Sequence, residues 1–230
     1  MEITEIIKEA FIFPSQNLEK LAIYIVLTFV LGLLAILGVF TIILGVNDGS
    51  FYFILTFILS FIGIVVSLII TGYLVGVLKS GIDHDESAPA LDWKNDFITG
   101  LKMLVVTIVY FIIPAIITLI VAFLTNVPGN IVNVAGYLNQ TTMNANGTVV
   151  ASSTLDMVPN SVMSGLIGSL SITLLVAAIL FIIFSFVQVM ANARLAKTDS
   201  LGEALNIPEA VRDIPKIGTG KVIATIVLMF

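Results

Sequence analysis

Residues 21–46 read LAIYIVLTFVLGLLAILGVFTIILGV, an apolar run without a charged side chain. About 20 apolar residues in a helix are enough to cross the roughly 30 Å hydrocarbon core of a bilayer. Three further runs of this kind follow at residues 51–78, 103–127 and 162–191, and none of the four contains Asp, Glu, Lys, Arg or His. The sequence therefore predicts an all-α fold, a polytopic transmembrane helical bundle with four full spans.

The composition supports one integral membrane domain over residues 1–230. Hydrophobic residues make up 58% of the chain and charged residues 11%, whereas charged residues are about a quarter of a soluble domain. A fifth apolar run, residues 222–230, is too short to span a bilayer. We expect it to be the start of a possible fifth span in a chain truncated at Phe230, rather than a partial segment that closes the protein.

Three segments next to the spans are predicted to be cytoplasmic interfacial amphipathic helices. In residues 1–20, apolar side chains recur at helical spacing until Pro14 interrupts the pattern. Asp92 is a candidate N-cap for a short helix with Trp93 at the headgroup level before the third span. Ser200 and Glu203 form a capping box after the fourth span, in a segment that Pro208 closes. The first and last of these segments share an offset pattern that hints at an internal repeat.

Basic residues set the expected topology. If the four spans alternate in direction, every Lys and Arg falls on one side of the membrane. These ten residues are Lys8, Lys20, Lys79, Lys94, Lys102, Arg194, Lys197, Arg212, Lys216 and Lys221. By the positive-inside rule, we expect a multi-pass protein of the cell membrane with a cytoplasmic N-terminus. Residues 47–50 would then form a tight exterior turn, and residues 126–161 a longer exterior loop.

The longer exterior loop contains two N-glycosylation sequons, which begin at Asn139 and Asn146. Asn146 and Gly147 also suit a tight turn between short strands, one ending near Met143 and the other starting at Val149. Both interpretations stay open.

Small and hydroxylated residues recur at helical spacing along one face of the second span: Thr56, Ser60, Gly63, Ser67 and Thr71. Such a stripe is typical of close helix packing, and a polar pathway through the bundle is the alternative. Near the end of the fourth span, Gln188 and Asn192 lie one helical turn apart. We expect them to cap or bridge helices.

Residues suited to catalysis are scarce. The chain has no cysteine and a single histidine, His84, which excludes thiolate chemistry and multi-histidine sites. Asp83, His84 and Asp85 are weak candidate metal ligands, but consecutive side chains point in different directions. We expect no metal site, no cofactor and no enzymatic activity.

A family resemblance rests on Gly72-Tyr73, Pro89, Asp92-Trp93, Phe97 and Gly100-Leu101-Lys102, and continues in the segment from Ala193-Arg194 to Ile217-Gly218. This pattern resembles a mostly archaeal membrane family, domain of unknown function 4013. The resemblance implies an integral membrane protein, commonly of five or six spans, with no established activity and no site residues to transfer.

These observations favour a non-enzymatic scaffold or accessory component of the cell membrane. Its expected partners are the lipid bilayer and other membrane proteins or a second copy of the chain, with no nucleic acid. The alternative is a permease or channel-like carrier of a neutral or lipidic substrate that uses the stripe on the second span.

Overall fold

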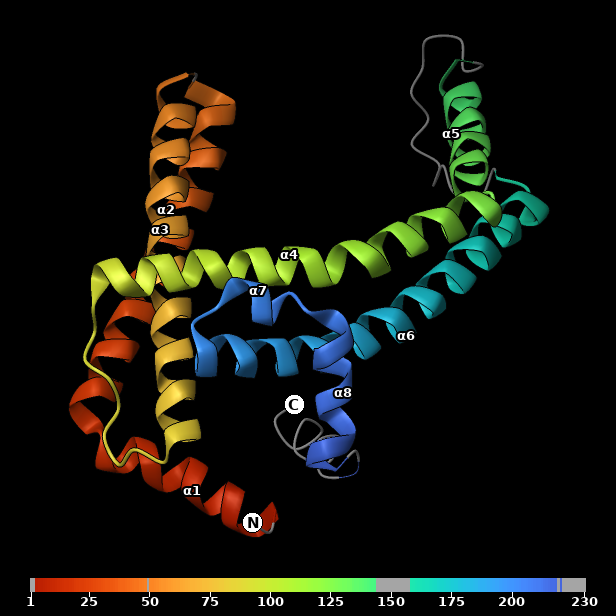
Figure 1. The fold of residues 1–230 in the computed structure, drawn as a ribbon. Helices are drawn as coiled ribbons and strands as arrows, with labels where there is room; N and C mark the ends of the chain where they lie inside the picture. The colour runs from red at the N-terminus through yellow and green to blue at the C-terminus, as the bar shows by residue number, and fades with distance from the viewer. Residues whose placement is uncertain (1–2, 49, 144–157, 219, 221–230) are drawn as a thin grey trace. The chain divides into compact units, whose positions relative to one another are not determined.

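The computed structural model describes residues 3–48, 50–143, 158–218 and 220, and the regular elements within these residues are all α-helices (Figure 1). In chain order they are α1 (Ile3–Gln16), α2 (Leu18–Asp48), α3 (Ser50–Asp83), α4 (Trp93–Leu124), α5 (Val127–Met143), α6 (Asn160–Thr198), α7 (Leu201–Ala204) and α8 (Ile207–Ile217). The predicted all-α fold class is confirmed.

Four of these helices, α2, α3, α4 and α6, are long and apolar enough to cross a membrane. Large hydrophobic side chains lie exposed along all four helices. Of the 18-residue apolar stretch that identifies each helix as a candidate span, only 11–17% is buried within the protein. Contiguous apolar surface of this extent is not found on soluble monomers. The four helices fit a multi-pass membrane protein, as predicted.

The long helices continue beyond the predicted spans. α6 has 39 residues and is therefore roughly 58 Å long at 1.5 Å per residue, about twice the hydrocarbon thickness. α4 runs without a break from Trp93 to Leu124, so the separate short helix predicted before the third span is wrong. A helix that continues into the headgroup region keeps its backbone N–H and C=O groups paired, so leaving the bilayer core does not require it to end.

Two predicted helix boundaries near α2 are also corrected. α1 passes through Pro14, where an interruption was predicted, and ends at Gln16. Pro14 has no N–H to donate four residues back, and the Asn17 N–H bonds to the Pro14 carbonyl at 3.2 Å just after the helix ends. At its other end α2 extends to Asp48 and α3 begins at Ser50, so the predicted turn at 47–50 is too long.

α5 lies in the segment predicted as an exterior loop. Because Val127–Met143 is helical, the interpretation with a short strand ending near Met143 is wrong; the second strand, from Val149, and the sequon at Asn146 lie outside the described residues. Asn126, immediately before α5, has a φ of 58°. Pro128 follows in the first turn, where a missing N–H costs no helical hydrogen bond.

α8 was not predicted either. Pro208 does not close the preceding segment but lies in the first turn of α8, and Asn206 caps that helix by accepting from the Glu209 N–H at 3.4 Å. Half of the predicted capping box before it is present, since the Ser200 side chain accepts from the Glu203 N–H at the start of α7. The reciprocal bond is not made: the Ser200 N–H donates to the Thr198 hydroxyl, and the Glu203 carboxylate accepts from Arg194. The partial fifth span at 222–230 lies outside the described residues.

The chain divides into two compact units, one of Met1–Val109 with Phe186–Phe230 and the other of Tyr110–Ser185. In the first unit, α2 and α3 lie side by side as a helical hairpin (Figure 1), and Val106, Ala191 and Leu195 are at most 1% exposed. In the second unit, Phe111 and Phe181 stack with ring centroids 5.6 Å apart. That the whole chain is a single domain stays a prediction.

Candidate functional site

α3 and α4 approach each other closely at two glycines of the first unit. A Cβ atom added at Gly72 would overlap the backbone of Asp96, and one added at Gly100 would overlap the backbone of Leu68. Both glycines belong to the string that carries the family resemblance. Their structural role is a helix crossing in which one backbone lies directly on the other, a type of contact that small residues permit.

Asn17 connects the start of α2 to the segment between α3 and α4. Its Nδ2 donates to the carbonyls of Phe13 at 2.9 Å and Glu86 at 3.1 Å, while its Oδ1 accepts from the Ala88 N–H at 2.8 Å. Sequence reasoning did not single out Asn17, because a contact over about 70 residues leaves no periodic signal. The Asn17 carboxamide thus provides hydrogen-bond partners for backbone groups of a connection that has no regular secondary structure.

Asp92 caps α4, as predicted. Its Oδ1 accepts from the N–H groups of Lys94 and Asn95, each at 3.2 Å. In return, the buried Asp96 accepts from the Asp92 N–H through Oδ2 at 2.8 Å. The reciprocal pair holds the start of α4 in place next to the Gly72 crossing.

Five ion pairs lie where α4, the end of α6, α7 and α8 meet, and we call the residues that form them the charged platform. These residues are Lys102, Arg194, Asp199, Glu203, Glu209, Arg212, Asp213 and Lys216. Three of the pairs connect different segments, and two lie within α8. Lys102 Nζ donates both to Asp199 Oδ1 at 2.7 Å and to the Asp199 carbonyl at 2.9 Å. That contact fixes the end of α6, where Asp199 has a φ of 53°, against α4.

Arg194 is the centre of the charged platform. Its Nη1 donates to Asp213 Oδ2 at 2.7 Å, its Nη2 to Glu203 Oε2 at 2.7 Å, and its Nε to the Glu203 carbonyl at 3.2 Å. Its side chain is 20% exposed. The planar guanidinium presents donors in fixed directions, so this one residue of α6 determines where α7 and α8 lie.

Asp213 of α8 lies between two cations. Lys216 donates to its Oδ1 at 2.9 Å and Arg194 to its Oδ2 at 2.7 Å. The hydrogen bond from Lys216, with that from Arg194, lowers the pKa of Asp213 below its ordinary value because both favour the ionised carboxylate. Asp213 therefore stays charged, and α8 stays attached, throughout the neutral pH range.

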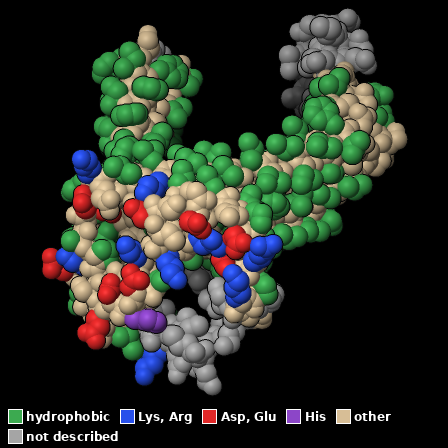
Figure 2. All heavy atoms as spheres, in the orientation of Figure 1, with side chains coloured by type: hydrophobic (Ala, Val, Ile, Leu, Met, Phe, Trp, Pro, Cys, Tyr) green, Lys and Arg blue, Asp and Glu red, His purple; other side chains and the backbone are tan. Residues whose placement is uncertain are grey.

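Figure 2 shows charged side chains gathered over the first unit away from the tip of the α2–α3 hairpin, whose surface is covered by hydrophobic side chains. Within the described residues of the second unit, 110–143 and 158–185, there is no Asp, Glu, Lys, Arg or His. Apart from Asp48, which ends α2 at the hairpin tip, the described charges of the first unit therefore lie away from that tip (Figure 2).

Gln188 bridges two helices, as predicted. Its Nε2 donates to the Thr107 hydroxyl of α4 at 2.8 Å. Asn192, one turn further along α6, has its Oδ1 buried without a hydrogen-bond partner among the described residues. The predicted pair thus contributes one interhelical bond, made by Gln188.

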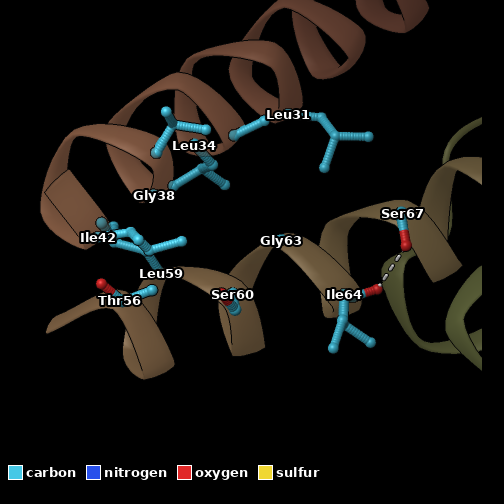
Figure 3. A pocket seen from close by; sticks show the side chains of 12 residues that line it. Leu31, Leu34, Gly38, Ile42, Thr56, Leu59, Ser60, Gly63, Ile64 and Ser67 are labelled. Carbon is cyan, nitrogen blue, oxygen red and sulfur yellow. Dashed lines mark hydrogen bonds between the residues drawn. The ribbon is translucent and has the colours of Figure 1, made fainter. Parts of the chain in front are cut away.

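Four residues of the predicted stripe, Thr56, Ser60, Gly63 and Ser67, line a groove between α2 and α3. The groove has a volume of about 360 Å³ and is otherwise lined mainly by aliphatic side chains such as Leu34. Figure 3 shows these lining residues on the facing sides of the two helices. Thr71 is not among them.

Hydroxyls of the stripe bond to the two helices themselves. Ser67 donates to the Ile64 carbonyl at 2.9 Å (Figure 3) and Thr71 to the Ser67 carbonyl at 2.8 Å. Thr56 lies 2.7 Å from the Thr41 hydroxyl of α2. Internal bonds of this kind favour packing, although the groove leaves room for a small apolar molecule.

The structure does not bring the weak metal candidates together. Asp83 ends α3, His84 has a φ of 58°, and the Asp85 N–H bonds to the Ser80 carbonyl at 2.9 Å. Among the described residues, no three His, Asp or Glu side chains are grouped as metal ligands would be. Asn139, the first sequon residue, lies in α5, but its side chain is outside the described part.

Comparison with known families gives one match. The family model described as "Protein of unknown function (DUF4013)" covers residues 55–230. No curated protein and no solved structure matches the chain.

Proposed function

We propose that this chain, which belongs to the DUF4013 family of proteins of unknown function, is a non-enzymatic scaffold or accessory component of the cell membrane. The observation that carries the proposal is the charged platform: four helix segments are fixed to one another by ion pairs at the end of apolar helices. Apolar helices of this length would hold the platform at a bilayer surface.

A prearranged surface suits docking of another protein. Arg194 loses hydration in its partly buried position, and three hydrogen bonds from its guanidinium compensate for that loss. Because the platform is already ordered, binding of a partner would not incur the entropy cost of ordering it. We expect the partner to be another membrane protein or a second copy of this chain.

Site-directed cross-linking tests this role. The chain has no cysteine, so single cysteines carrying a photoactivatable cross-linker can be placed at Glu209 on the platform and at Ser50 on the hairpin tip. In native membranes, the platform position should give a discrete cross-linked product that the tip position does not give. Arg194→Gln should reduce its yield about tenfold, whereas Lys94→Gln, at an exposed position on α4 outside the platform, should not.

Two results would end the scaffold proposal. One is the absence of any discrete product from the platform, including a product with a second copy. The other is a product whose yield is the same in the Arg194→Gln variant, since the ordered platform would then be irrelevant to it.

The groove between α2 and α3 favours a second candidate, a permease or channel-like carrier of a neutral or lipidic substrate. Small residues leave the groove open, and Gly38 of α2 borders it with no other side chain within 4 Å of its would-be Cβ atom. If water enters, cysteines at Thr56, Ser60 and Ser67 will react with a water-soluble thiol reagent in membranes. Protection at all three positions would reject an aqueous pathway along this face.

A further inference from the structure

α8 has one face that is turned outward over its whole length. Its exposed residues are Pro208, Val211, Arg212, Pro215 and Lys216, which follow the helical i, i+3, i+4 spacing. Val211 is 45% exposed, and the side chains of Arg212 and Lys216 are 71% and 65% exposed. The outward face thus combines apolar side chains with two cations.

The acidic residues of α8 lie nearer the protein. Glu209 and Asp213 have side-chain exposures of 33% and 24%, about half or less of the values for the cations they pair with. Asp213 also accepts from Arg194 of α6, so its charge is shared between a cation on the inner side and one on the outer side. The ion pairs therefore separate charge across the helix, with acids inward and bases outward.

The remaining side of α8 already has its contacts. Ala210 is fully buried, Ile207 and Ile214 are half-buried, and Arg194 holds Asp213. Nothing among the described residues covers the outward face, so a second surface can meet it while the helix stays attached. α8 begins nine residues after the end of α6, a helix long enough to cross a membrane, so an α6 that crosses the bilayer would be followed by α8 on the side where it emerges.

We infer that the outward face of α8 binds the anionic headgroup surface of the lipid bilayer. Val211 and the two prolines enter the interface, while Arg212 and Lys216 reach phosphate groups with their long side chains. Charge complementarity selects anionic over zwitterionic lipid, since each Lys or Arg near an anionic surface adds favourable binding energy. This inference goes beyond the scaffold role: Arg212 and Lys216 also belong to the charged platform, but the inference concerns lipid at the outward face of α8, whereas the scaffold role concerns a protein partner.

An environment-sensitive fluorophore on Val211→Cys tests the inference in the otherwise cysteine-free chain. The full chain is reconstituted into nanodiscs of phosphatidylcholine alone or of phosphatidylcholine with phosphatidylglycerol. We expect a blue-shifted emission in the anionic nanodiscs and an aqueous emission in the zwitterionic ones. Arg212→Gln with Lys216→Gln should shift the docking equilibrium by roughly 25-fold, about fivefold for each cation.

The matched control is Lys79→Gln with Lys94→Gln, which removes the same charge from exposed positions on α3 and α4 and should leave the emission unchanged. Equal emission in the two lipid compositions would overturn the inference. So would a blue shift that appears in neutral detergent as the protein concentration rises, because a second copy would then cover this face.

Discussion

Gly72 and Gly100 determine how closely α3 approaches α4. Each lies against the backbone of the other helix, where an added methyl group would overlap a carbonyl or Cα atom that cannot rotate away. Other glycines of the spans, such as Gly32, have no neighbour within 4 Å of the would-be Cβ atom. The same residue type is therefore essential at the crossing and replaceable at positions such as Gly32.

Gly72→Ala and Gly100→Ala should each lower the free energy of unfolding of the detergent-solubilised protein by about 1–3 kcal/mol or more, because the helices must separate to admit the methyl group. Thermal unfolding followed by size-exclusion chromatography measures the effect. Gly32→Ala is the control and should be neutral or stabilising, since alanine favours helix over glycine. Equal losses in all three variants would refute the assigned crossing.

Asn17→Ala removes the side-chain bonds to Phe13, Glu86 and Ala88, and so should loosen the connection between α3 and α4. Amide hydrogen exchange at Ala88 should accelerate roughly fivefold or more, because a lost hydrogen bond lowers the cost of local opening by about 1 kcal/mol or more. Asn95→Ala, at an exposed position on α4, should leave that amide unchanged. Unchanged exchange in the Asn17 variant would show that the clamp does not hold this segment.

At the scale of the helices, α8 depends on one residue of α6. Arg194→Gln leaves Glu203 and Asp213 without their shared cation, and we expect the attachment of α8 to weaken by about 1–2 kcal/mol, less than a fully buried pair would lose. Faster hydrogen exchange confined to α7 and α8 would report this. Arg212→Gln, which removes the more exposed pair with Glu209, should change the exchange by far less.

Acid should also release α8. Lys216 and Arg194 lower the pKa of Asp213. The stabilisation that ionised Asp213 gives to the attachment of α8 is therefore complete above the ordinary carboxyl pKa of about 3.9, and it is lost as the pH falls through the lowered pKa. The mobility of a spin label on Val211→Cys in neutral detergent should therefore be constant at neutral pH and rise only below about pH 4. Asp213→Asn should be mobile already at neutral pH. A midpoint near pH 6 would contradict the assignment.

How well the sequence predicts these elements depends on how far apart along the chain the residues of each pattern lie. Apolar runs predict the four spans, and local caps at Asp92 and Ser200 are also correct, because both signals lie within a few residues. The sequence does not predict α5 and α8. The polar composition of α5 is typical of a loop, and Pro208 indicates the end of one helix although it lies in the first turn of the next, α8. The Arg194 contacts depend on how α7 turns the chain, and a linear sequence does not show that path.

At the scale of the whole molecule, the division of charge is the main feature. Apart from Asp48 at the end of α2, the described charged residues of the first unit lie away from its hairpin tip, and the described part of the second unit carries no charge (Figure 2). That the N-terminus and the charged platform lie in the cytoplasm stays a prediction from the positive-inside rule and four crossings. The side of the membrane on which the platform lies determines which partners and lipids can reach it.

The most direct test is the sidedness of two single cysteines, at Ser87 between α3 and α4 and at Ser50 at the start of α3. In intact cells, a membrane-impermeant thiol reagent should label the cysteine at Ser50 and should label the cysteine at Ser87 only after lysis. Labelling of both from the same side would contradict the four-crossing arrangement, and labelling of Ser87 alone from outside would reverse its orientation.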